Sequence, residues 1–226
     1  MPKDPSVTLL EIVNHSLRNH PDFLLDICNL NPSSFSGVLS REMVEWERVG
    51  YSTPAPVRVK NAVLLRHSLS DAVWIETGTL HGDTSDFLSR HASHVHTIEP
   101  HPELFSNALI RFASHKNVTI YNEMSETFLA RFLPSVSGNV CFWLDGHYSS
   151  EGTFKGPNDT PLLEELQAIK SNFGRFERVA ILIDDIRLCG KRHVYGVYPT
   201  LSSLVAFADE LNLSWCIEHD IFIASN

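Results

Sequence analysis

The stretch Trp74–Leu88, WIETGTLHGDTSDFL, joins a strand-like run to a helix-like run through a turn that contains two glycines. The run before the turn is apolar, which predicts a buried strand, and DTSDFL after it has the spacing of a helix. Gly78 would let the backbone approach a ligand closely, and Gly82 would let the helix pack on the strand. This order predicts a ligand site at the carboxyl edge of a parallel sheet.

The chain from residue 71 onward alternates strand-like and helix-like runs. Apolar strands separated by helices predict an α/β fold, in which both faces of a parallel sheet are covered by helices. The strand-like runs are AVWIETG (72–78), HVHTIEP (94–100), NVTIYN (117–122), NVCFWLDG (139–146), RVAILIDDI (178–186) and SWCIEHDIFIAS (214–225).

Residues 1–70 follow a different pattern. SVTLLEIVNHSL has apolar residues at helical spacing, NPSSFSG and GYSTPAP are rich in turn-forming residues, and VRVKNAVLLRHSL (57–69) could be a helix leading into the main domain. The sequence therefore predicts a helical N-terminal extension over residues 1–70, acting as a lid or a dimer contact, and one main domain over residues 71–226.

Composition limits the cellular setting. The chain has 226 residues, 43% of them hydrophobic, and four scattered cysteines without a CxxC pair, which predicts one sizeable core and free thiols in a reducing compartment. The N-terminus lacks the pattern of a signal peptide, and no apolar run approaches the roughly 20 residues of a membrane helix. We expect a cytoplasmic protein without a membrane partner.

The formal net charge of −9 falls entirely on one part of the chain. Residues 1–70 carry seven Lys+Arg and seven Asp+Glu, whereas residues 71–226 carry 11 and 20. An acidic domain is a poor electrostatic match for nucleic acid. A small-molecule substrate is the expected partner.

Acidic residues at predicted strand ends indicate which ligand the glycine turn suits. Glu99 ends the strand after the turn, at a place where an acid accepts hydrogen bonds from ribose hydroxyls. The dinucleotide fingerprint GxGxxG is missing, and Glu76 precedes the glycines where a pyrophosphate would disfavour negative charge. Such a turn suits a ligand that carries an amine or sulfonium cation, such as S-adenosylmethionine.

Residues 71–226, about two thirds of the chain, resemble the class I S-adenosylmethionine-dependent methyltransferases. Glu76–Gly82 matches the first motif of that family, and Glu99 matches its second-strand acid. The resemblance implies a Rossmann-like, doubly wound, mostly parallel seven-stranded sheet. It also implies a donor site formed by Glu76, Gly78, Thr79, Gly82, Thr84, Glu99 and Ser125. Ser125 opens a predicted helix, so it could instead be an N-cap.

Three further carboxylates predict a metal site. Asp145 ends the fourth strand of the domain, and Asp184 and Asp185 end the fifth. Carboxylates that converge repel one another unless a cation lies between them, and oxygen ligands favour Mg²⁺. The arrangement is similar to that of the macrocin and novobiocin sugar O-methyltransferases, which implies a catalytic base two residues after the first aspartate. Here that position holds His147, which can accept a proton near neutral pH.

Each of these residues also has a simpler interpretation. Asp145 could only position the methionine amine, Asp184 and Asp185 could cap a helix, and His147 could be a loop residue without a role. The favoured function is metal-assisted O-methylation of a small polyhydroxylated or glycosyl substrate, with Asp145 and His147 as catalytic residues. The alternatives are an NAD-dependent oxidoreductase on the same sheet and a non-catalytic nucleotide- or S-adenosylmethionine-binding protein. The protein could form a homo-oligomer through its extension.

Overall fold

The computed structural model of the protein describes residues 38–146, 160–190, 192–193 and 196–226. The chain divides into two compact units, Met1–Ser52 and Thr53–Asn226. Helix α4 (Val38–Arg48) belongs to the first unit, and α5 (Val57–Arg66) to the second. The roles predicted for the extension, a lid or a dimer contact, stay predictions. Across the described ranges, no helix has both the length and the apolar character needed to span a bilayer.

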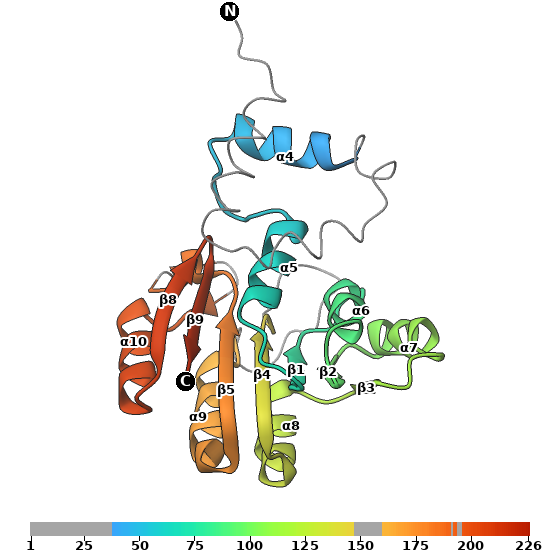
Figure 1. Ribbon diagram of the computed structural model, residues 1–226, viewed down its shortest axis with the longest axis vertical. Helices are drawn as coiled ribbons and strands as arrows, with labels where there is room; N and C mark the ends of the chain where they lie inside the picture. Colours follow the sequence, from blue (N-terminus) through green and yellow to red (C-terminus); the bar gives the residue numbers. More distant parts are fainter. Residues whose placement is uncertain (1–37, 147–159, 191, 194–195) are drawn as a thin grey trace, which may run out of the picture. The chain divides into compact units, whose positions relative to one another are not determined.

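The second unit is built on a seven-stranded sheet in the order β3-β2-β1-β4-β5-β9-β8, in which β9 runs antiparallel to the other six strands (Figure 1). The predicted Rossmann-like, mostly parallel fold is confirmed. The strands are β1 (Val73–Thr77), β2 (His94–Ile98), β3 (Val118–Tyr121), β4 (Gly138–Leu144), β5 (Phe176–Ile183), β8 (Ser214–Glu218) and β9 (Ile221–Ser225), and a separate pair is β6 (Arg192–His193) with β7 (Gly196–Val197).

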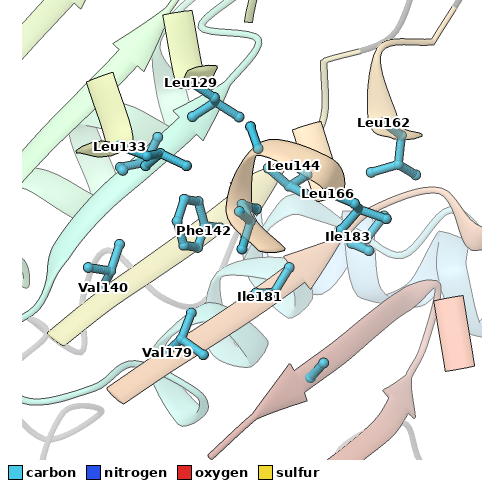
Figure 2. Packing of buried hydrophobic residues seen from close by; sticks show 14 of the residues in the cluster. Leu129, Leu133, Val140, Phe142, Leu144, Leu162, Leu166, Val179, Ile181 and Ile183 are labelled. Atoms are coloured by element: carbon cyan, nitrogen blue, oxygen red, sulfur yellow. The ribbon is translucent and has the colours of Figure 1, made fainter. Parts of the chain in front are cut away.

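Helices cover both faces of this sheet because its strands are apolar on both sides. One core joins β1, β4 and β5 to α8, α9 and α10, and Figure 2 shows Phe142 and Ile181 in its centre. The other core joins the opposite side chains of the same strands, such as Trp74 and Trp143, to α5 and α6. The helices of the sheet are α6 (Asp83–Ser89), α7 (Pro102–Arg111), α8 (Ser125–Phe132), α9 (Leu162–Asn172) and α10 (Leu201–Glu210), with short 3₁₀ turns at Leu133–Ser135, Phe173–Arg175 and Ile186–Leu188.

The strand register brings four strand ends to the same level. Thr77 of β1 pairs with Ile98 of β2 and with Leu144 of β4, and Leu144 pairs with Ile183 of β5. All four are the last residues of their strands. The four residues that follow them therefore form one row along the carboxyl edge of the sheet, in the order Glu99, Gly78, Asp145, Asp184.

Candidate active site

The glycine loop after β1 is folded against its neighbours on both sides. Gly78 has a φ of +90°, and a Cβ atom there would lie 2.9 Å from the backbone oxygen of Asp145. Gly82 has a φ of +82°, and its Cβ would lie 2.7 Å from the Phe112 ring. The N–H groups of Gly78 and Thr79 both donate to the Ile98 carbonyl, at 3.0 and 3.1 Å. Side chains are thus excluded from both glycine positions by backbone conformation and by space.

Glu99 lies beside this loop and is held by backbone donors. Its Oε2 accepts the Leu80 N–H at 2.8 Å, and its Oε1 accepts the His101 N–H at 2.9 Å. The residue is only 4% exposed. Burial raises the pKa of the Glu99 carboxyl above its usual value, while the two N–H donors act in the opposite direction. The result is a fixed carboxylate at the end of β2, next to the loop, as the sequence predicted.

Glu76 does not belong to the row of strand-end residues. It is the penultimate residue of β1 and is buried, where its Oε2 accepts from the Ser85 hydroxyl and, at 2.8 Å, from the Thr97 hydroxyl. Burial raises its pKa to about 7, against the effect of these hydroxyls. The Thr79 hydroxyl is also occupied, lying 2.6 Å from that of Thr97. Both side chains tie the loop to the strand beneath it, and Thr84 is half-buried in the first turn of α6.

Ser125 is the first residue of α8, and Met124 is its N-cap, so the N-cap alternative for Ser125 is wrong. The side chain is buried beside Glu165 of α9. Burial raises the pKa of Glu165 to about 7, and the hydroxyls of Ser125 and Thr77 act in the opposite direction. Within the described ranges, Glu165 Oε1 and Thr77 Oγ1 have no hydrogen-bond partner of ordinary geometry. A Cβ on Gly146 would contact both atoms, at 3.3 and 3.1 Å.

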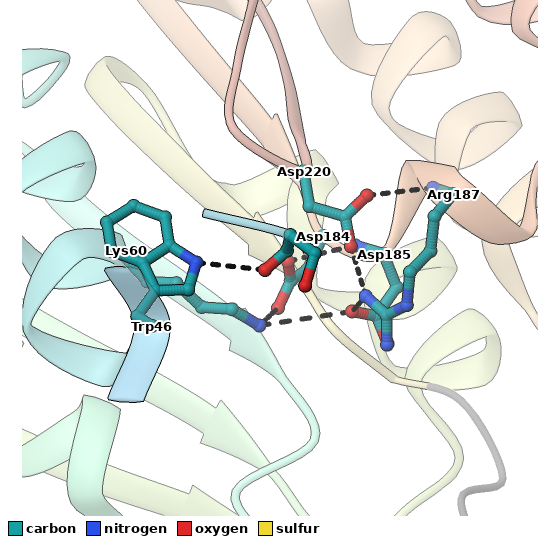
Figure 3. A network of polar contacts seen from close by, with 7 residues as sticks. Trp46, Lys60, Asp184, Asp185, Arg187 and Asp220 are labelled. Carbon is teal, nitrogen blue, oxygen red and sulfur yellow. Dashed lines mark hydrogen bonds and ion pairs between the residues drawn. The ribbon is translucent and has the colours of Figure 1, made fainter. Parts of the chain in front are cut away.

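The aspartates at the other end of the row are paired with side-chain cations (Figure 3). Lys60 of α5 donates to Asp184 and lies 3.9 Å from Asp185 Oδ1. Arg187 donates from its guanidinium to Asp185 and Asp220, and from its backbone N–H to Asp220 Oδ1 at 2.9 Å. Burial lowers the pKa of Lys60, but the neighbouring carboxylates outweigh it and raise that pKa above its usual value.

The carboxylates whose oxygens lie closest together are not the same three that the sequence predicts as metal ligands. In the described part of the chain, Asp184, Asp185 and Asp220 place carboxylate oxygens within 4.8 Å of one another, and Asp145 is not in that group. Asp145 is half-buried between Gly78 and Asp184, and its charge acts on both Lys60 and Asp184. His147 lies outside the described residues.

Asp184 and Asp185 do not cap a helix with their side chains, so this alternative is wrong. Asp185 precedes the short Ile186–Leu188 turn with a left-handed φ of +58°, and neither side chain makes a capping hydrogen bond to it. The Asp184 Oδ1 instead accepts the Asp185 N–H at 2.9 Å.

Sequence reasoning missed four residues of this region: Lys60, Glu165, Arg187 in its pairing role, and Asp220. Glu165 carried a signal, because it occupies an apolar position of its helix between Leu162 and Ile169. Asp220 lies in the turn between β8 and β9, which is a common place for aspartate. Lys60 carried none, since it pairs with a residue 124 positions away.

The comparisons with known proteins add a general likeness. No family model matches the chain, and no curated protein matches it. Among solved structures it is similar to the N-methyltransferase NodS from Bradyrhizobium japonicum (14% identity, 74% of this chain and 93% of that chain, TM-score 0.49). It is also similar to an rRNA methylase from Streptococcus thermophilus (13%, 76% and 96%, TM-score 0.45) and to a SAM-dependent methyltransferase from Aquifex aeolicus (17%, 73% and 86%, TM-score 0.46). At these values the likeness carries no conclusion about activity or substrate.

Proposed function

We propose that the Thr53–Asn226 unit is an S-adenosylmethionine-dependent methyltransferase whose donor lies at the carboxyl ends of β1 and β2. One observation carries this proposal. The Glu99 carboxylate is buried at the end of β2 and fixed by the N–H of Leu80, which belongs to the glycine loop after β1. A ribose on that loop would meet an acceptor whose position is already set.

The hydrogen-bonding groups at this edge of the sheet fit S-adenosylmethionine. A carboxylate offers about four lone-pair positions, and the described backbone donors take one on each oxygen of Glu99. The remaining positions suit the two neighbouring hydroxyls of a ribose. Gly78 keeps the loop free of side chains above β1, and Asp145, the next residue along the row, suits the α-amino group. Glu76, Thr79, Gly82 and Thr84 would shape the loop, and Ser125 would lie near the adenine.

The reaction we propose is O-methylation of a small polyhydroxylated or glycosyl acceptor. S-adenosylmethionine supplies a methyl group on a positively charged sulfur, which an acceptor oxygen can take. His147, two residues after Asp145, would remove the hydroxyl proton. Holding the acceptor in line is the chain's main contribution. The acidic charge of residues 71–226 supports a small acceptor over a nucleic acid.

Magnesium does not fit the site as it is built. The metal prediction rested on three carboxylates without a counter-charge, whereas Lys60 and Arg187 supply two positive charges to this cluster. Lys60 donates to one Asp184 oxygen and the Asp185 N–H donates to the other, so an ion at Asp184 would lie against the ammonium of Lys60. We therefore derive no step of the reaction through a metal ion.

Calorimetric titration with S-adenosylhomocysteine, and separately with NADH, tests the proposal against its alternatives. We expect micromolar binding of S-adenosylhomocysteine and none of NADH. Binding of NADH alone would favour an oxidoreductase, because Glu99 would suit its ribose equally well. If neither ligand binds, the proposed S-adenosylmethionine site is contradicted.

A binding protein without chemistry is the remaining alternative. Incubation with isotopically methyl-labelled S-adenosylmethionine and a panel of hydroxylated acceptors separates it from an enzyme. Label transfer to any acceptor supports the methyltransferase, and replacement of His147 by alanine should then lower the rate at least tenfold. Tight donor binding with no transfer to any compound would favour the binding protein.

A further inference from the structure

The acidic cluster at the ends of β4 and β5 has an ammonium group inside it. Lys60 reaches from α5 with its side chain only 20% exposed, and it donates to Asp184, whose side chain is 1% exposed. Its Nζ lies 3.9 Å from Asp185 Oδ1, and the charge of Asp145 attracts it as well. Two of the three carboxylates that the sequence predicts as metal ligands, Asp184 and Asp185, thus lie against the same cation.

An ammonium and a divalent ion need the same oxygens. Mg²⁺ is held by oxygen atoms at about 2.0–2.1 Å, so Lys60 would have to leave Asp184 before such an ion could enter. Arg187 binds both oxygens of Asp220 and Oδ1 of Asp185. A metal would then lie close to a second positive charge, which repels it.

We propose that Lys60 is the resident cation of this cluster: it takes the place of a divalent ion between Asp184 and Asp185, and loss of its charge opens a divalent-cation site. The contacts of the cluster carry this inference independently of the reaction. Its consequence for catalysis, methyl transfer that persists in EDTA, rests on the proposed function.

Manganese titration followed by electron paramagnetic resonance tests the proposal directly, because Mn²⁺ reports on magnesium-type oxygen sites whatever the reaction is. The variants are Lys60→Met, which removes the charge but keeps an apolar stem, and Arg58→Met as the matched control, an exposed cation on the same helix. Lys60→Met should bind one Mn²⁺ at least tenfold more tightly than the wild type, and Arg58→Met should match the wild type. Adding Asp184→Asn to Lys60→Met should abolish the new site.

Two results would overturn the proposal. One is a wild-type Mn²⁺ site that Asp184→Asn removes, since the cluster would then hold a metal beside Lys60. The other is a folded Lys60→Met protein that binds Mn²⁺ no better than Arg58→Met. If Lys60→Met does not fold, Lys60→Gln replaces it, and the wild-type titration with Asp184→Asn decides the question without either variant.

Failure of this inference is distinguishable from failure of the proposed function. Titration with S-adenosylhomocysteine tests the donor site at Glu99, and the manganese titration tests the cluster at Asp184. A protein that binds no donor but gains Mn²⁺ on loss of Lys60 would refute the methyltransferase and keep the resident cation.

Discussion

Two ends of one sheet edge hold their carboxylates in opposite ways. At the end of β2, Glu99 is bound by two neutral backbone N–H groups, so its negative charge remains available to a ligand. At the end of β5, Asp184 and Asp185 are instead paired with the side-chain cations of Lys60 and Arg187. The same chemical group at equivalent strand ends is therefore held by backbone N–H groups in one place, where we propose that it binds a ligand, and is paired with cations in the other. What differs is the group that the fold places beside each carboxylate, which is a neutral backbone N–H group in one case and a side-chain cation in the other.

The largest expected effect is on the glycine loop that lies beside Glu99. Gly78→Ala should lower the free energy of unfolding by about 4 kcal/mol, because it adds an unfavourable φ to a close contact with a backbone oxygen. The new Cβ would lie 2.9 Å from the Asp145 oxygen, and φ is +90°. Urea unfolding measures the change.

Gly138→Ala is the matched control for that variant. Gly138 has a similar φ of +82°, but a Cβ atom there would have no neighbour within 4 Å, so only the backbone cost of about 1–2 kcal/mol applies. Equal costs for the two variants would show that the loop is not packed against the end of β4.

Glu165 tests what happens to a carboxylate that has no backbone donor and no cation among the residues that the structure describes. Its folded pKa of about 7 lies above the ordinary value of 4.5. The unfolded chain releases this proton first, so the stabilising contribution is complete below about pH 4.5 and is lost as pH rises through 7. As pH rises over this interval, the free energy of unfolding of the wild type should fall by on the order of 3 kcal/mol because of this residue.

Glu165→Gln should remove that loss and leave the shares of Glu76 and Asp184, because burial raises the pKa of each of these two carboxyls to about 7 as well. Urea unfolding at pH 5 and pH 8 measures both slopes, and Glu164→Gln, an exposed neighbour on α9, is the control. An unchanged pH dependence in Glu165→Gln would mean that Glu165 is solvated or paired.

A smaller loss of stability is expected when Arg187 is removed from the aspartates with which it pairs. Arg187→Met should cost about 2 kcal/mol, below the range for a fully buried pair because the Arg187 side chain is 31% exposed. It leaves Asp185 and Asp220 without their guanidinium, and Arg187→Lys should recover part of the loss. Urea unfolding measures both variants.

The control for Arg187 is Arg90→Met, which breaks the surface pair between Arg90 and Asp86. Arg90 is 66% exposed, so that loss should stay below about 0.5 kcal/mol. Similar values for Arg187→Met and Arg90→Met would mean that solvent, and not the guanidinium, compensates the aspartates.

The difference between the two ends also explains how much the sequence could predict. The sheet, the glycine loop and the place of Glu99 follow from local patterns: apolar runs, glycine spacing and the alternation of strands with helices. Glu99 follows the end of β2, and it accepts hydrogen bonds from Leu80, 19 positions before it in the glycine loop, and from His101, two positions after it. The predicted fold is confirmed for these reasons.

The paired end could not be predicted because two of its contacts join residues that are distant in the chain. Lys60 precedes Asp184 by 124 positions, and Arg187 reaches an aspartate 33 positions away. Arg187 is only two positions after Asp185, but the sequence does not show that it pairs with Asp185 and Asp220 together, and the three aspartates therefore suggested a metal. Glu76 was misplaced for a different reason: an acid one residue before the strand end points into the core, where Ser85 and Thr97 satisfy it.

The central claim is that Glu99 at the end of β2 binds the donor. Calorimetric titration of S-adenosylhomocysteine into the wild type, Glu99→Ala and Glu103→Ala tests it most directly, because Glu103 is an exposed glutamate in the first turn of α7. We predict about 100-fold weaker binding for Glu99→Ala, from the loss of two charge-assisted hydrogen bonds, and wild-type affinity for Glu103→Ala. Binding by folded Glu99→Ala within about threefold of the wild type would contradict the claim.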